Sequence, residues 1–281
     1  MATSKEIRRR IKSATNTKQI IKAMELVSVI KMQKAVVANM ASRPYTESAD
    51  GILDGLCANL DPLEHIYLRP GKGDHKLVIL VTTDRGLCGN MNARVVKKLI
   101  EDFGDSKFDI VVLGKKGRDL LRSMKVSIIA EFYGVTDSLD FKDEYPILKL
   151  IESEYKTQKY QSISIIYPHF ISTLAQEATT IQLLPIQAKS TTTSNAPIIY
   201  EPDKKEVLNR LIPRVLETIL WQTLLETIAS EHSARMINMK NANENAEDLI
   251  DDLTLSFNQS RQANITSELA EISAGKMTLE E

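Results

Sequence analysis

The chain has 281 residues, of which 43% are hydrophobic and 5% aromatic, and its net charge is −1 at pH 7. The low aromatic content favours helices over a β-sandwich, and no apolar run approaches the ~18 residues of a membrane span. The start, MATSKEIRRR, lacks the apolar segment of a secretory signal, and two cysteines make no disulfide framework, so we expect a reducing, intracellular protein.

Residues 1–60 are predicted to form an N-terminal coiled-coil helix. No Gly or Pro lies between Ser4 and Ala41, and residues 1–43 hold ten Lys or Arg and two Glu. Pro44 predicts a kink or short break near Ser42, because proline removes a helix hydrogen bond. One helical face carries Ile7, Ile11, Ala14, Ile21, Met24, Val27 and Met32.

Residues 76–187 are predicted to form a small Rossmann-like α/β domain, because strand and helix patterns alternate there. β-Branched runs predict strands at 76–83, 109–114, 125–133, 162–167 and 178–186. Helical patterns lie between them at 92–103, 116–124 and 147–159. A polar Ser/Thr linker follows at 189–197.

Residues 203–281 are predicted to form a second long helix, which Asp203 can cap and Pro213 can bend. A stripe of mostly small residues recurs at three- and four-residue steps, the spacing of a coiled coil. Its members are Ala246, Leu249, Leu253, Ser256, Ser260, Ala263, Ser267, Ala270 and Ala274. Residues 231–281 hold four Lys or Arg and ten Asp or Glu, so an antiparallel pair with the N-terminal helix matches basic to acidic. A helix of ~70 residues spans roughly 105 Å, so we expect an elongated chain.

The chain shows no pattern for catalysis, a metal or a cofactor. It has no phosphate-binding loop of the G-x-x-x-x-G-K-[ST] type. Gly86 and Gly89 follow a predicted strand, but their spacing is that of a tight turn and not of a dinucleotide site. The four histidines show no ligand spacing, and Cys88 fits a buried small side chain better than a nucleophile.

The basic N-terminus does not indicate a nucleic-acid partner. Arg8, Arg9 and Arg10 are consecutive, so they point around the helix, and no aromatic residue precedes Tyr45 to stack on bases. A protein surface with acidic grooves is the better partner.

Four segments resemble the gamma subunit of F-type ATP synthases. They are NTKQIIKAMELVSVIKM at 16–32, DRGLCGNMN at 84–92, SEHSARMINMKNANENA at 230–246 and NQSRQANITSELAEI at 258–272. ASRPY, LLPI and IYEPD add shorter matches, and the resemblance covers essentially the whole chain in order. Asn90 departs from the family, which usually has a third Gly there. The chain lacks a transit sequence and the paired-Cys insertion of the chloroplast form, so it resembles the bacterial type.

The resemblance implies a central rotor shaft with no catalytic site of its own. Its terminal helices would form an antiparallel coiled coil inside a ring of alpha and beta subunits, and its α/β body would meet the epsilon subunit and the c-ring. Ion flow would turn the c-ring and the shaft, whose asymmetry would drive the catalytic sites. The protein would lie at the cytoplasmic face of the bacterial plasma membrane, attached only through the complex.

Position in the family motifs also implies contact residues. Contacts with the alpha and beta subunits would come from Lys22, Met24, Glu25, Arg235, Lys240, Arg261, Gln262, Thr266 and Glu268. Tyr200 and Glu201 would belong to the foot that meets epsilon or the c-ring. An apolar tip, Ile265, Leu269 and Ile272, would slide against a sleeve more easily than interlocked aromatic side chains would.

Two other classes stay open from the residues alone. A Rossmann-like enzyme with helical extensions would bind NAD or ATP stoichiometrically. A static coiled-coil scaffold would carry strongly apolar heptads instead of the small-residue stripe.

Overall fold

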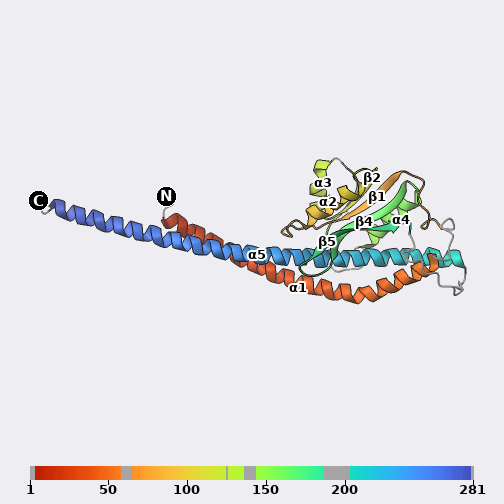
Figure 1. Ribbon diagram of the computed structural model, residues 1–281, viewed down its shortest axis with the longest axis horizontal. Helices are drawn as coiled ribbons and strands as arrows, with labels where there is room; N and C mark the ends of the chain where they lie inside the picture. Colours follow the sequence, from red (N-terminus) through yellow and green to blue (C-terminus); the bar gives the residue numbers. More distant parts are fainter. Residues whose placement is uncertain are drawn as a thin grey trace. The chain divides into compact units, whose positions relative to one another are not determined.

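The computed structural model describes residues 4–57, 65–124, 126–135, 144–186, 201 and 203–279 (Figure 1). The described helices are α1 (Ser4–Cys57), α2 (Met91–Phe103), α3 (Lys115–Leu121), the 3-10 turn η2 (Arg122–Met124), α4 (Tyr145–Lys156) and α5 (Lys204–Leu279). The strands are β1 (His75–Val81), β2 (Phe108–Leu113), β3 (Ser127–Phe132), β4 (Tyr160–Phe170) and β5 (Gln176–Leu184). In the described part of the chain, no helix is both apolar enough and long enough to cross a membrane.

Contacts divide the chain into two compact units. The smaller unit holds Met1–Val27 and Met236–Glu281, and the larger unit holds Ser28–Arg235. The two terminal helices, of 54 and 76 residues, therefore each contribute to both units.

The larger unit contains a five-stranded sheet in the order β3-β2-β1-β4-β5. The first four strands are parallel, and β5 runs antiparallel to β4. β1 is buried on both faces, which explains its continuous apolar run from Leu77 to Val81. The predicted fold class, long terminal helices with a small α/β sheet, is confirmed.

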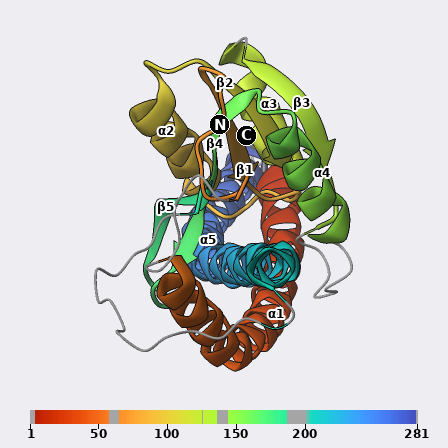
Figure 2. The same ribbon diagram turned by 90° about the vertical axis from the view of Figure 1, so that its right-hand side faces the viewer.

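Helices cover both faces of this sheet. On one face Val95 and Leu99 of α2 pack against Val78 and Leu80 of β1. On the other face, α4 and the first part of α5 bury their apolar sides, with Leu220 of α5 fully covered. Within this unit α5 lies between the sheet and α1 (Figures 1 and 2). The first part of α5 is therefore one of the helices that pack on the sheet.

In the smaller unit α1 and α5 pair antiparallel. The Ser4 hydroxyl lies 3.0 Å from the Ser260 hydroxyl, and Lys18 Nζ lies 3.1 Å from a carboxylate oxygen of Glu247. From the first contact to the second, the residue number increases along α1 and decreases along α5, so the two helices run antiparallel. The ion pair joins the basic helix to the acidic one, as the charge pattern predicted.

The predicted stripe of mostly small residues on α5 is correct in part. Ala246, Leu253 and Ser260 are half-buried, but Leu249 is exposed and Ile250 is covered in its place. Similarly, Ser256 is exposed where Phe257 is half-buried, and Val27 on α1 is exposed. The direction of the partner helix decides which neighbour turns inward. Ala263, Ser267 and Ala270 are exposed, since described α1 begins at Ser4, opposite Ser260.

The ends of the helices test two further predictions. Asp203 caps α5 as predicted, because its Oδ1 accepts a hydrogen bond of 2.9 Å from the Glu206 amide. Of the predicted kink or short break near Ser42, the break is absent, since α1 runs through Pro44 as one helix. Beyond Pro44, Ala49 packs against the core of the larger unit. Linker residues 189–197 lie outside the described residues.

Candidate functional site

A band of polar side chains lies on α5 in the larger unit. We call Gln222, Glu226, Ser230, Glu231, His232 and Arg235 the α5 collar. All except the half-buried Gln222 are buried. Charged side chains are seldom fully buried unless they are paired, so the partners of the collar define what it does.

The first half of the collar joins three elements. The Gln222 amide donates to Asn39 of α1 at 3.1 Å and to Glu226 at 3.2 Å. Glu226 also lies 2.5 Å from Nδ1 of His169 on β4. The Ser230 hydroxyl donates to the carbonyl of Pro168 at 2.9 Å. These bonds tie α1, α5 and β4 together in addition to their apolar packing.

The second half of the collar centres on Arg235. Its guanidinium lies 2.5 Å from a Glu231 carboxylate oxygen and donates to the carbonyl oxygen of Gly86 at 3.2 Å. It also lies 3.1 Å from Nδ1 of His232. Burial and then the Arg235 charge lower the pKa of His232 to about 4, so the imidazole is neutral at pH 7 and Nδ1 can accept the bond. All three partners of Arg235 are therefore acceptors.

Gly86 belongs to the turn between β1 and α2, the tight turn that the sequence predicts. The Asn92 amide closes it, donating to the Thr83 hydroxyl at 2.9 Å and to Cys88 Sγ at 3.3 Å. Leu87 and Gly89 both have positive φ, 66° and 62°. Gly adopts such angles without strain, whereas a leucine does so only when its surroundings hold it.

The departure at Asn90 leaves this turn intact. Asn90 has φ −92° and ψ 10°, a conformation open to residues other than glycine. Cys88 is buried beside Met91 and Ala234, as expected for a small packing residue. Burial raises the pKa of its thiol, which disfavours the reactive thiolate.

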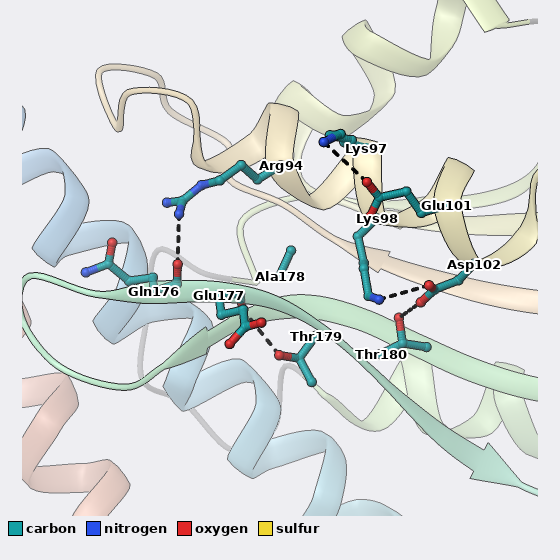
Figure 3. A pocket seen from close by; sticks show the side chains of 10 residues that line it. All are labelled: Arg94, Lys97, Lys98, Glu101, Asp102, Gln176, Glu177, Ala178, Thr179 and Thr180. Carbon is teal, nitrogen blue, oxygen red and sulfur yellow. Dashed lines mark hydrogen bonds and ion pairs between the residues drawn. The ribbon is translucent and has the colours of Figure 1, made fainter.

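A groove in the larger unit lies between α2 and β5 (Figure 3). Its volume is about 570 Å³, and both cationic and anionic side chains line it. Four of those charges pair within the groove: Lys97 with Glu101 at 3.3 Å and Lys98 with Asp102 at 2.9 Å. Arg94 donates to the carbonyl of Gln176 at 2.8 Å. An ionic ligand would have to displace these partners to bind the paired side chains or Arg94.

The predicted contact residues differ in how exposed they are. Met24 and Glu25 are half-buried. Seven others are exposed: Lys22, Lys240, Arg261, Gln262, Thr266, Glu268 and Glu201. Lys22 and Glu25 form an ion pair of 2.9 Å along α1. Arg235 differs from all of these because it is buried inside the chain. Tyr200 lies outside the described residues.

Most of the collar is not predicted from the sequence. On a helix, Glu226, Glu231 and His232 read as ordinary polar positions, and their partners lie far away in the sequence. One signal was available: Glu231 and Arg235 are spaced i, i+4 within a stretch rich in buried small and apolar residues. That signal is weak, since exposed helix pairs have the same spacing.

Comparison with known proteins places the whole chain in one group. The ATP synthase family model matches residues 3–279. The ATP synthase gamma chain of Herpetosiphon aurantiacus is 37% identical over 293 residues, covering 99% of each chain. That of Chloroflexus aurantiacus is 38% identical over 288 residues, again covering 99% of each. A chain of the Euglena gracilis mitochondrial ATP synthase, OSCP/F1/c-ring, shares the fold with a TM-score of 0.74 at 20% identity, over 98% of this chain and 93% of that one. The chain therefore belongs to the ATP synthase gamma chain family.

Proposed function

We propose that this chain is the central shaft of an F-type ATP synthase. It couples ion flow through a membrane c-ring to ATP synthesis or hydrolysis in a ring of alpha and beta subunits. Family membership over the full length supports this function. The observation that carries it is the contrast along α5: apolar side chains from Leu208 to Leu224 are buried against the sheet, whereas every side chain from 261 to 273 is exposed.

We propose three functional segments: a coiled-coil helix at 1–60, an α/β domain at 76–187 and a second coiled-coil helix at 203–281. The alpha and beta subunits would surround the exposed part of the coiled coil. The epsilon subunit and the c-ring would contact the α/β domain and the foot residues Tyr200 and Glu201. The protein would then sit peripherally at the cytoplasmic face of a bacterial membrane, held there by the complex.

In this proposal the chain performs no bond chemistry. The collar gathers titratable groups, but Glu231, His232 and Arg235 are buried, and Arg235 bonds to both of the others. Four of the charged side chains in the α2–β5 groove are likewise paired. ATP would be bound and cleaved by the partner subunits.

The proposed alpha and beta contacts near the end of α5 share one side of the helix. Arg261, Ile265, Glu268 and Ile272 follow the i, i+4, i+7, i+11 spacing, and Gln262, Thr266 and Leu269 lie beside them. Ile265, Leu269 and Ile272 are 49%, 59% and 69% exposed. A mixed apolar and polar face can engage several partner conformations in turn without a deep binding well at any one. Lys22, Met24, Glu25 and Lys240 would add contacts along the coiled coil.

The function is tested by tagging the chain in its host membranes and measuring what copurifies and what the preparation does. We expect alpha, beta, epsilon and c subunits to copurify, and membrane vesicles to pump ions when they hydrolyse ATP. Vesicles lacking this chain should hydrolyse ATP without pumping. Copurification with none of these subunits, or pumping that persists without the chain, would exclude the shaft.

A further inference from the structure

The bond between Arg235 and Gly86 joins two parts of the larger unit that differ in character. Arg235 belongs to α5, whereas Gly86 belongs to the turn that follows β1. The exposed tip of this turn carries Arg85 and Leu87, and Leu87 is 56% exposed despite its positive φ. An apolar side chain held outward in an unfavourable backbone conformation requires support from its surroundings.

The support comes from beneath the turn. Cys88 and Met91 pack against Ala234 of α5, and Arg235 donates to the Gly86 carbonyl from the next position along the helix. The arginine side chain is 7% exposed and the Glu231 side chain 4%. A planar guanidinium with several fixed donors can hold Glu231, His232 and Gly86 simultaneously, which a lysine cannot do with the same geometry.

We propose that Arg235 is a positioning residue that locks the turn of residues 84–90 to α5, so that the tip of the turn keeps a fixed angle about the helix axis. This inference rests on the proposed shaft function, because a fixed angle matters most where a rotating helix presents the turn to other subunits. Arg235 then acts through the turn, and its side chain touches no partner subunit. The family motif implied that Arg235 contacts partner subunits; in this proposal the exposed tip of the turn makes that contact instead.

The first test is hydrogen exchange of the amides that flank the turn, Thr83 and Met91, which donate to Asn92 and to the Cys88 carbonyl, measured on the full chain. Arg235→Gln should accelerate this exchange about tenfold or more, since each tenfold corresponds to the loss of roughly 1.4 kcal/mol of protection. Arg94→Gln is the matched control, because the Arg94 side chain also donates to a backbone carbonyl, that of Gln176 at the start of β5. Unchanged exchange of these two amides in Arg235→Gln would overturn the lock.

The second test separates positioning from stability. Replacing a buried ion pair by apolar residues of similar size commonly preserves folding, so Glu231→Met with Arg235→Met should fold yet lack the bond to Gly86. In reconstituted vesicles this double variant should assemble and hydrolyse ATP, but pump several-fold fewer ions per ATP than the wild type. Arg94→Gln should keep the wild-type ratio. A wild-type ratio in the double variant would show that Arg235 serves folding alone.

The two proposals fail in different ways. If the wild-type chain neither joins the complex nor supports pumping, the shaft function fails. The exchange experiment needs no partner subunit, so it still decides whether Arg235 locks the turn.

Discussion

Two segments of the same helix, α5, are used in opposite ways. From Gln222 to Arg235 most polar side chains are buried, and four of them, Gln222, Glu226, Ser230 and Arg235, bond to α1, to β4 or to the turn after β1. From 261 to 273 every side chain is exposed; the Thr266 hydroxyl bonds to the Gln262 carbonyl within the helix, and the Asn264 amide donates to the Ser4 hydroxyl at the start of α1. Both segments are rich in small and polar residues. Composition therefore does not distinguish an internal joint from a surface open to partners; the distinction comes from what packs on each segment.

The largest expected effect is in the anchored part of α5. Leu220→Ala removes a side chain that is fully buried in the sheet core. Such truncations cost about 2–5 kcal/mol, because they lose burial and leave a cavity. Chemical denaturation of the full chain, followed by circular dichroism, measures the change. Leu255→Ala, at a position 61% exposed, is the control and should change little. Equal losses at both positions would mean that α5 is not anchored as described.

A pH-dependent effect is expected where α4 meets α5. Burial, and then the charge of Glu217, raise the pKa of Glu144 to about 8, although Arg214 opposes the shift. The folded chain therefore holds this proton more tightly than the unfolded chain, whose carboxyl has the ordinary pKa of 4.5. The associated stability is complete below pH ~4.5, falls as the pH rises and is lost above pH ~8.

Glu144→Gln should remove this dependence. Relative to the wild type, the variant should gain roughly 3 kcal/mol in unfolding free energy between pH 5 and pH 9. The measurement is the unfolding midpoint across that range, with the exposed Glu268→Gln as the control. A difference between Glu144→Gln and the wild type that does not vary with pH would contradict the assignment.

The ion pair between α1 and α5 should contribute little. Lys18 and Glu247 are 29% and 59% exposed in their side chains, and such pairs give at most about 1 kcal/mol, less in high salt. A double-mutant cycle with Lys18→Ala and Glu247→Ala measures the coupling. A coupling energy above that range, insensitive to salt, would show that charge, and not apolar packing, holds the coiled coil together.

The smallest effect on stability is expected near the end of α5. Leu269→Ala should change the unfolding free energy by no more than about 0.5 kcal/mol, because the side chain is 59% exposed. In the assembled complex the same variant should alter ATP hydrolysis. A large loss of stability in the isolated chain would mean that this segment packs on the chain itself.

The sheet and the helix cap could be predicted from the sequence because their signals are local. β-Branched runs mark strands buried on both faces, and Asp203 has its capping partner three residues away. The buried members of the stripe on α5 were less predictable, since Leu249 and Ile250 are both apolar and only the partner helix decides which of them is covered.

The collar could not be predicted because its bonds join distant parts of the chain. Arg235 and Gly86 are 149 positions apart, and Glu226 and His169 are 57 apart. The residues near the end of α5 were found through family motifs alone. Their exposure agrees with a role in contacting partners, but periodicity gave no reason to choose them over other exposed positions.

Rotation of the chain inside the complex tests the central claim most directly. Leu174 is 81% exposed on the loop between β4 and β5, so Leu174→Cys, with Cys57 and Cys88 replaced by Ser, can carry a single visible probe. With the alpha–beta ring fixed to a surface and ATP supplied, the shaft proposal predicts sustained rotation of the probe in one direction. Hydrolysis of ATP by the same complexes with no net rotation of the probe would contradict it.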